Sequence, residues 1–385
     1  MTAIRILHLS DIHFSESNFW QGLHELDMQV PHRYGHDPRL LIALDRKIKE
    51  IAWDLVVISG DLTRVGHLDS FSYVKNWLYE KMQIPGGGEI GLNLDEADKK
   101  CFVIPGNHDC FNDRLRQHSL TNYKKFFPDI PGRSVERIQV RGTNVNIHLY
   151  DSTYDKGGFA EGYIPPSAFQ DWQTDDATLD IVVVHHHLAQ APSHKRHHSL
   201  ELINVDQFVA FLLSKNINGV LFGHTHESFF EKISADILRN QIMFRRKWPR
   251  WLRQMFPRYF NKPIIDSLSF SRVPTKNGRF PSFNKYFEYL YIKNILKKDI
   301  NGPESFEEPR HFYDHIGSYR SGYDDRLLNL RKKKMAFSMA PSPTCVEGDG
   351  NGFHVLEFNW DGNKFLYDCE RYFWDGTDFV LEPKK

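Results

Sequence analysis

Residues 102–109 read Phe102-Val103-Ile104-Pro105-Gly106-Asn107-His108-Asp109. The apolar run from Cys101 to Ile104 has the composition of a short β-strand, and Pro105-Gly106 ends it. Three polar residues follow, and each can bind a metal ion or carry a proton. On its own, Gly-Asn-His-Asp is also an ordinary turn composition. Four other predicted strands end in similar polar residues, and this repetition favours one shared site over five unrelated turns.

The other apolar runs that predict strands lie at residues 4–9, 54–59, 144–150, 180–184 and 219–222. The polar residues that follow four of them are Asp11 and His13, Asp61, His185 to His187, and His224 and His226. Side chains two positions apart share one face of an extended chain, so each Asp-x-His or His-x-His pair is expected to point at one ion.

Helical spacing of apolar residues lies between these strands, at residues 39–53, 67–82 and 204–215, with a short helix near 166–172. Strands that alternate with helices predict an α/β fold. Ligands of such folds bind at the carboxyl ends of the strands, which is where the polar residues collect.

The ordered set of motifs resembles the signature of the calcineurin-like metallophosphoesterases: Asp11-Ile12-His13, Gly60-Asp61, Gly106-Asn107-His108-Asp109, His185 and Gly223-His224-Thr225-His226. The resemblance covers roughly residues 4 to 226. It implies an αββα sandwich of two sheets flanked by helices, with two divalent metal ions at one edge. The last strands of the fold are expected between Ala336 and Phe379.

The resemblance also implies the ligands of each ion. Asp11, His13 and His226 would hold one ion, Asn107, His185 and His224 would hold the other, and Asp61 would bridge them. A metal-bridging hydroxide would then attack phosphorus, because two bound cations activate water and clamp the reacting oxygens. Imidazole and carboxylate ligands suit manganese, zinc or iron, and the residues alone do not choose among them.

Other site residues follow from the same resemblance. His108 would contact the phosphate and protonate the leaving oxygen. Asp109 would orient the ring of His108. The three consecutive histidines His185, His186 and His187 leave open which one binds the metal ion. We expect His185 to be the ligand, with His186 on the substrate side or behind the ligands. His194, His197 and His198 are expected on the rim of the site.

A second feature is the uneven charge along the chain. The whole protein has no net charge, but residues 229–335 carry 23 Lys and Arg and 11 Asp and Glu, which leaves 26 and 38 for the rest. Residues 244–260 mix cations with aromatic rings, and residues 331–334 are all basic. We therefore divide the chain into a catalytic domain, 1–228 with 336–385, and a basic aromatic insert, 229–335, that we expect to be a helical cap.

Three interpretations of the insert remain open. Cations interleaved with aromatics suit nucleic acid. Basic stretches with Trp and Phe also suit an anionic membrane surface. The third interpretation is a cap or a homodimer contact whose cations face solvent. Arg245 and Arg246 are expected to contact the substrate together with His186.

Chain length, composition and cysteine content indicate the general class of the protein and its location. A chain of 385 residues that is 41% hydrophobic can bury a large core. The first residues enter a strand without a leader pattern, which predicts a cytoplasmic protein, or one that is peripheral at a membrane. Four widely spaced cysteines predict reduced thiols.

We therefore expect a metal-dependent phosphodiesterase. Its Asp11-Ile12-His13 and His185-His186-His187 blocks look like those of the bacterial cyclic-nucleotide phosphodiesterase branch, so a cyclic nucleotide or nucleotide-like diester is the first expected substrate. The alternatives are a nuclease, a lipid-linked pyrophosphate hydrolase at a membrane surface, and a non-catalytic scaffold of the same fold. The scaffold is disfavoured because every matched ligand position is filled.

Overall fold

The computed structural model describes residues 3–15, 36–84, 88–95, 100–110, 119–128, 133–153, 162–169, 178–188, 202, 207–208, 211–212, 214–215, 217–226, 228–232, 335–344 and 350–383. These residues belong to one compact unit, which spans Met1–Pro192, Ser199–Ile233 and Lys334–Lys385. Two six-stranded sheets form the centre of this unit.

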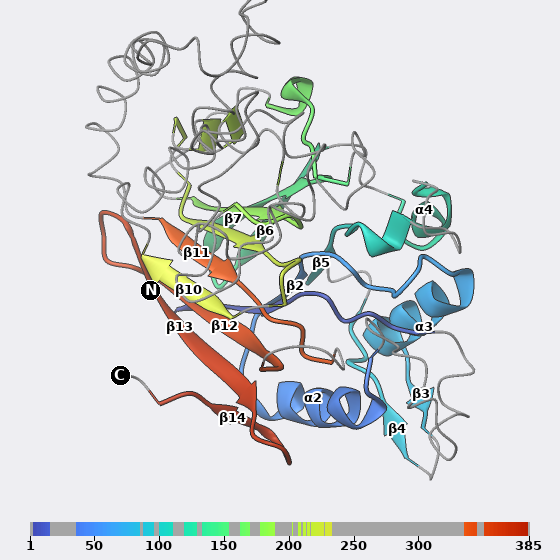
Figure 1. The fold of residues 1–385 in the computed structure, drawn as a ribbon. Coiled ribbons are helices and arrows are strands. Elements are labelled where there is room, and N and C mark those ends of the chain that lie inside the picture. Colours follow the sequence, from blue (N-terminus) through green and yellow to red (C-terminus); the bar gives the residue numbers. More distant parts are fainter. Residues whose placement is uncertain are drawn as a thin grey trace, which may run out of the picture. The chain divides into compact units, whose positions relative to one another are not determined.

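The first sheet has the order β14-β13-β12-β1-β2-β5. Its bounds are β1 Ile4–Leu9, β2 Leu55–Ile58, β5 Cys101–Val103, β12 Gly352–Trp360, β13 Phe365–Trp374 and β14 Phe379–Leu381. Strands β1, β2 and β5 run parallel to one another, while β12 pairs antiparallel to β1. The C-terminal strands β12 to β14 therefore extend the sheet that the N-terminal strand begins (Figure 1).

The second sheet has the order β10-β11-β9-β8-β7-β6. Its bounds are β6 Arg133–Val140, β7 Thr143–Tyr150, β8 Leu179–Val184, β9 Gly219–Phe222, β10 Phe229–Lys232 and β11 Ala336–Met339. Strands β7, β8, β9 and β11 are parallel, and β6 and β10 close the two edges antiparallel. A separate ribbon pairs β3 Met82–Gln83 with β4 Glu89–Ile90.

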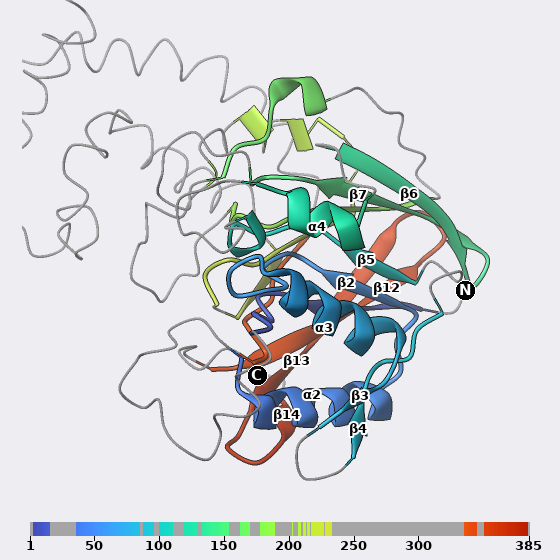
Figure 2. The same cartoon turned by 90° about the vertical axis from the view of Figure 1, so that its right-hand side faces the viewer.

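Three described α-helices flank the sheets: α2 Pro38–Glu50, α3 Leu68–Tyr79 and α4 Thr121–Phe126. Two short 3₁₀ helices lie at His108–Cys110 and Pro166–Ala168. Helix α2 begins where the Asp37 side chain accepts from the Arg39 N–H and Pro38 fixes the first turn. In Figure 2, α3 lies beside α4, and in both views α2 lies beside β14.

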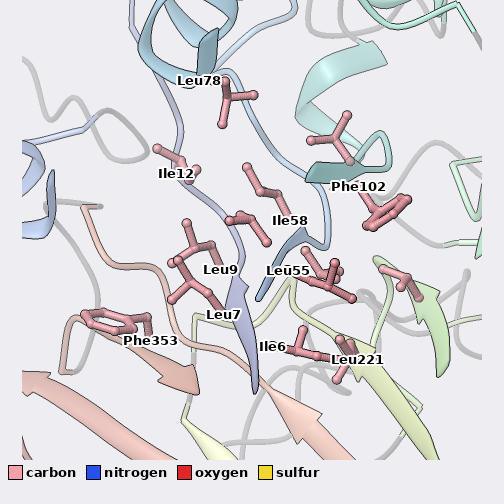
Figure 3. Close-up of a cluster of buried hydrophobic side chains, with 14 of the residues drawn as sticks. Ile6, Leu7, Leu9, Ile12, Leu55, Ile58, Leu78, Phe102, Leu221 and Phe353 are labelled. Atoms are coloured by element: carbon pink, nitrogen blue, oxygen red, sulfur yellow. The ribbon is translucent and has the colours of Figure 1, made fainter. Parts of the chain in front are cut away.

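The hydrophobic core combines residues of both sheets and of the helices. Figure 3 shows Ile6 of β1 beside Leu221 of β9, which belongs to the other sheet. Leu7 and Leu9 alternate to the opposite face of β1, as a period of two requires. The two sheets therefore pack face to face through apolar side chains.

A polar chain crosses this apolar core. His8 Nδ1 lies 2.9 Å from Ser338 Oγ, and Ser338 Oγ lies 2.9 Å from His354 Nδ1. The other nitrogen of His8 lies 3.0 Å from Ser59 Oγ. All four residues are fully buried, so these hydrogen bonds join β1 and β12 to β11 of the other sheet.

This architecture confirms the predicted α/β sandwich of two sheets. The chain stays in the second sheet as far as Lys232, so β10 uses the first four residues of the range assigned to the insert. The rest of the insert, including its expected helical cap, lies outside the described residues.

Cys101, Cys110 and Cys369 are free thiols. Among the described residues, no helix is long and apolar enough to cross a bilayer.

Candidate metal centre

The loops that leave β1, β2 and β5 of one sheet, and β8 and β9 of the other, meet at one edge of the sandwich. Backbone hydrogen bonds connect them: Asp11 N donates to Gly60 O at 2.9 Å and His13 N donates to Asp61 O at 3.0 Å. The two sheets are joined by His224 N, which donates to Asp11 Oδ2 at 2.9 Å. Parallel strands bring their carboxyl ends to the same edge, so the topology itself gathers these loops.

The backbone at these loops is unusual. Among the described residues, seven non-glycine residues have positive φ, and five of them are Asp11, His13, Asp61, His224 and His226. Such left-handed conformations cost about 1 kcal/mol or more each and cluster at functional sites. The chain therefore curls at these positions. The expectation of an extended Asp-x-His face was wrong, because left-handed turns bring the side chains together.

One cluster contains Asp11, His13 and His226. His13 Nε2 lies 3.0 Å from His226 Nε2, and His226 Nε2 lies 3.4 Å from Asp11 Oδ1. Asp11 Oδ1 is buried and forms no hydrogen bond within the part of the chain that the structure describes. A buried carboxylate oxygen in this condition is costly unless a cation meets it.

A second cluster contains Asp61, His185 and His224. His185 Nε2 lies 3.0 Å from Asn107 Oδ1, 3.1 Å from His224 Nδ1 and 3.4 Å from Asp61 Oδ2. Asp61 Oδ2 also lies 3.9 Å from His13 Nε2 of the first cluster. The same carboxylate oxygen thus stands between the two groups of ligands, as a bridging role requires.

The donor atoms fit metal ions. Ligand atoms that share an ion at about 2.1 Å lie roughly 3.0–3.4 Å apart. The distances given above within each cluster fall in that range, and the remaining pair of the first cluster, His13 Nε2 and Asp11 Oδ1, is wider at 3.9 Å. Carboxylate, imidazole and amide groups are common ligands of first-row transition metals. The seven residues expected to bind metal are therefore brought together, and the two groups share Asp61.

The protonation of the histidines also bears on metal binding. Burial, with neighbouring His108, holds the pKa of His13 well below its usual value, and burial with His186 and His185 does the same for the pKa of His224. Burial opposes charge on His185 too, but Asp61 overrides it and raises the pKa of His185 to about 9. In the metal-free chain His185 therefore keeps a proton that a metal ion must displace.

The pKa values of the two carboxylates, Asp61 and Asp11, are both lowered. Burial alone would raise the pKa of Asp61, but the charges of His185 and His108 hold it well below the usual range. Burial alone would also raise the pKa of Asp11, but the interaction of Asp11 with His226 lowers that pKa below its usual value. Both groups are ionised near neutral pH, which is the state that binds a cation.

His108 lies at the edge of this centre. Its backbone N donates to Asp61 Oδ1 at 2.8 Å, and its ring meets that of His13 edge-on at 4.8 Å between centroids. Its Nδ1 lies 2.7 Å from Arg64 O. Since a carbonyl can only accept, Nδ1 carries a proton and Nε2 is the nitrogen left for other chemistry.

Asp109 was expected to orient His108, but its carboxylate binds other groups. Its carboxylate accepts from Leu62 N, Thr63 N, Thr63 Oγ1 and Gly106 N at 2.8–3.1 Å. Burial, reinforced by the charge of Asp61, raises its pKa to about 7. The carbonyl of Arg64 orients His108 instead, and Asp109 ties the loop that carries Asp61 to the loop that carries Asn107.

His186 lies behind the ligands. It is fully buried, its Nδ1 lies 2.8 Å from Ser152 Oγ, and its ring centroid lies 4.6 Å from that of His224. His187 is also buried and stacks at 6.1 Å on His224. Arg245, Arg246, His194, His197 and His198 lie outside the described residues, so the structure does not place them.

Sequence reasoning missed several supporting groups. Ser59 O lies 2.8 Å from His185 Nδ1, which turns Nε2 of that ring toward Asp61. Ser342 Oγ donates to Asp11 O and Thr344 Oγ1 donates to Ile12 O, each at 2.5 Å. Ser342 and Thr344 are more than 330 positions away along the chain, and no local pattern connects them with Asp11.

Comparison with known proteins gives the family. Residues 4–228, more than half of the chain, match the sequence profile described as calcineurin-like phosphoesterase. No match was found among curated proteins.

Two solved structures are similar over part or all of the chain. One is described as GAP50, the anchor in the inner membrane complex of Plasmodium, with 12% identity, a TM-score of 0.36, and coverage of 59% of this chain and 68% of that one. The other is a hypothetical protein from Thermus thermophilus, with 13% identity, a TM-score of 0.30, and coverage of 99% and 100%.

Proposed function

The chain belongs to the calcineurin-like phosphoesterase family, and we propose that it is a phosphodiesterase that hydrolyses a cyclic nucleotide or a nucleotide-like diester. The family supports metal-dependent hydrolysis of phosphate esters, and clustered His and Asp side chains that could bind metal are present. The observation that carries the proposal is the position of Asp61 Oδ2, 3.4 Å from His185 Nε2 and 3.9 Å from His13 Nε2.

Two divalent ions fit these residues. Asp11, His13 and His226 would hold one, Asn107, His185 and His224 the other, and Asp61 both. Manganese, zinc and iron suit such ligands. When bound, the ions would supply an activated water and would offset the charge of the phosphate. The other ligands are neutral, so only Asp11 and Asp61 reduce the positive charge that attracts an anionic substrate.

His108 is proposed as the acid that protonates the leaving oxygen. Its Nδ1 proton is engaged by Arg64 O, so the imidazolium form would donate from Nε2. Histidine suits this role because its ordinary pKa lies near neutrality. Asp109 contributes indirectly, by fixing the loops on which Asp61 and Asn107 stand.

Diesters are preferred to monoesters in this proposal because of the motif resemblance to the cyclic-nucleotide branch. The test is a substrate panel with Mn²⁺: 3′,5′-cyclic AMP, 2′,3′-cyclic AMP, single-stranded DNA, a lipid pyrophosphate and p-nitrophenyl phosphate. We expect kcat/KM for a cyclic nucleotide to exceed that for the monoester at least tenfold. A preference for the monoester would contradict the assignment.

A His108→Asn variant tests the acid. Nitrophenolate leaves without help from a proton, whereas an alkoxide does not, so the two kinds of substrate respond differently. We expect turnover of the cyclic nucleotide to fall roughly 10²–10⁴-fold, and turnover of bis(p-nitrophenyl) phosphate to fall much less. Equal losses on both substrates would assign His108 to binding alone.

The alternatives rest on residues 229–335, where basic residues outnumber acidic ones by 23 to 11. A nuclease would prefer the DNA, and a lipid pyrophosphate hydrolase at a membrane surface would prefer the lipid. A scaffold would hydrolyse none of the panel.

A further inference from the structure

A series of hydrogen bonds between side chains leads from the surface to a residue that contacts a predicted metal ligand. It begins at Ser228, an exposed residue whose hydroxyl lies 2.9 Å from His354 Nε2. Ser338, His8 and Ser59 follow in that order, with contacts of 2.9, 2.9 and 3.0 Å. All of these residues except Ser228 are fully buried. We call the five residues the serine–histidine network.

The hydrogen bonds of this network all point in one direction. Ser59 Oγ donates to Leu9 O at 3.4 Å, since a carbonyl only accepts. Ser59 Oγ therefore accepts from His8 Nε2, so His8 Nδ1 carries no proton and accepts from Ser338 Oγ. Ser338 Oγ in turn accepts from His354 Nδ1. Burial lowers the pKa of both histidines, which keeps the two rings in the neutral form that this pattern requires.

Ser59 also contacts a predicted metal ligand. Its backbone carbonyl accepts from His185 Nδ1 at 2.8 Å, which leaves Nε2 of that ring to face Asp61 and Asn107. The next residue, Gly60, has a φ of 103°, and a Cβ atom there would clash with the His185 ring. The peptide between Ser59 and Gly60 therefore determines both the position and the tautomer of His185.

Two of these hydrogen bonds cross between the sheets. His185 follows β8 of the second sheet and Ser59 follows β2 of the first, so the bond between them joins the two sheets. The bond between His8 of β1 and Ser338 of β11 joins the sheets as well. Loss of Ser338 Oγ would leave buried ring nitrogens without a partner, which favours movement of His8 and of the Ser59 side chain that it holds.

From this geometry we propose that His8 and Ser338 are positioning residues for the ion that His185 holds. They act through Ser59, because the hydroxyl that His8 holds fixes the peptide whose carbonyl aims His185 Nε2. Neither His8 nor Ser338 is itself a ligand of the proposed centre. The inference rests on the two-ion centre of the proposed function, but it concerns metal affinity and is independent of which phosphate ester is the substrate.

The experiment is calorimetric titration of Mn²⁺ into the metal-stripped full-length protein. Ser338→Ala removes the central hydroxyl of the network and changes the side-chain volume little. Partners behind metal ligands typically change affinity about 10–100-fold, so we expect the ion held by His185 to bind at least about tenfold more weakly. The other ion is expected to change less. Ser70→Ala is the matched control, because Ser70 is also a fully buried serine and its Oγ has no hydrogen bond to any residue that the structure describes.

Two further comparisons separate positioning from general loss of stability. Asp45→Ala removes a buried carboxylate that accepts from Trp77 Nε1 at 3.2 Å and from Gly91 N at 2.8 Å. We expect this variant to melt at a lower temperature and to bind Mn²⁺ as the wild type does. His8→Gln keeps an N–H group for Ser59 and His8→Leu does not, so we expect the glutamine variant to bind the weakened ion at least about threefold more tightly.

Equal Mn²⁺ affinity in Ser338→Ala and Ser70→Ala, with two ions bound by the wild type, would overturn the inference and leave the metal centre standing. A loss in Asp45→Ala as large as that in Ser338→Ala would overturn it too, as would equal affinities of His8→Gln and His8→Leu. Absence of Mn²⁺ binding by the wild type would overturn this inference together with the proposed centre. Ser338→Ala is the mildest change, so it keeps the test valid where His8→Leu does not fold.

Discussion

At the residue scale, the metal centre depends on strained backbone held by remote side chains. Asp11 and His13 both have a φ of 54°, which an extended strand would not have. The carbonyls of Asp11 and Ile12 accept from Ser342 and Thr344, which come from the chain after β11. These hydroxyl groups hold the turn that aims the two ligands at one point.

We predict that the double variant Ser342→Ala, Thr344→Val weakens Mn²⁺ binding. Partners behind metal ligands typically change affinity about 10–100-fold, so we expect the ion held by Asp11, His13 and His226 to bind at least about tenfold more weakly. The other ion is expected to bind as before. Isothermal titration with Mn²⁺ measures both sites.

Ser214→Ala is the control for this prediction, because Ser214 Oγ also donates to a carbonyl, that of Phe211, at 2.6 Å on the surface. Equal Mn²⁺ affinity in the double variant and in this control would show that the hydroxyl groups do not position the ligands.

At the element scale, the two sheets are joined by apolar packing and by the buried chain of His8, Ser338 and His354. Burial lowers the pKa of His8 to about 3, although the charge of Asp11 acts in the opposite direction. Burial also lowers the pKa of His354 well below its usual value. Both rings are therefore neutral in the folded protein.

This predicts a pH dependence of stability. Between about pH 6.5 and pH 3 the unfolded chain protonates His8 and the folded chain does not, so the free energy of unfolding falls as the pH falls. The slope from one such histidine is about 1.4 kcal/mol per pH unit. Above about pH 6.5 neither state binds the proton, and this contribution is constant.

Urea unfolding of the metal-free protein at pH 7.5, 6.5, 5.5 and 4.5 measures the effect. We expect His8→Gln to be less stable than the wild type at pH 7.5 but to lose stability less steeply below pH 6.5. Parallel profiles for the two proteins would mean that His8 titrates alike in the folded and unfolded chains.

The elements differed in how well the sequence predicted them. Strands β2 and β9 are buried on both faces and are continuous apolar runs, and β1 and β8 are apolar apart from Arg5, His8 and Asp180. Their ends and the polar residues after them were therefore found. Strand β6 alternates charged and apolar residues, Arg133 to Val140, and was missed because one face is polar. Helix α4 has only six residues, too few for a period of 3.6 to be visible.

The site was predictable for the same reason. Each predicted ligand lies within four residues of the end of a strand, so local pattern located it. What could not be predicted depends on contacts between distant segments. The orientation of His108 by Arg64 O, the position of His186 behind His224, and the support from Ser342 all arise only when the two sheets pack.

At the scale of the whole molecule, the described unit is a family sandwich whose ligand-bearing edge lies at the ends of both sheets. The chain outside residues 229–335 is acidic, with 38 acidic against 26 basic residues, whereas the insert has the opposite sign. We propose that the insert binds an anionic partner, either nucleic acid or membrane lipid. The alternative is a cap or a homodimer contact whose cations face solvent or the acidic body. The substrate panel favours nucleic acid if the DNA is hydrolysed and membrane lipid if the lipid pyrophosphate is hydrolysed.

The most direct measurement is hydrolysis of bis(p-nitrophenyl) phosphate by metal-stripped protein after Mn²⁺, Zn²⁺, Fe²⁺ or Mg²⁺ is added back separately, beside Asp61→Asn. Asp378→Asn, a substitution of a surface carboxylate, is the control. We predict turnover that needs an added ion, is kept by Asp378→Asn and falls at least about a hundredfold in Asp61→Asn, because the shared ligand holds both ions. Turnover in Asp61→Asn equal to that of the wild type, or no turnover by folded protein with any ion, would contradict the account.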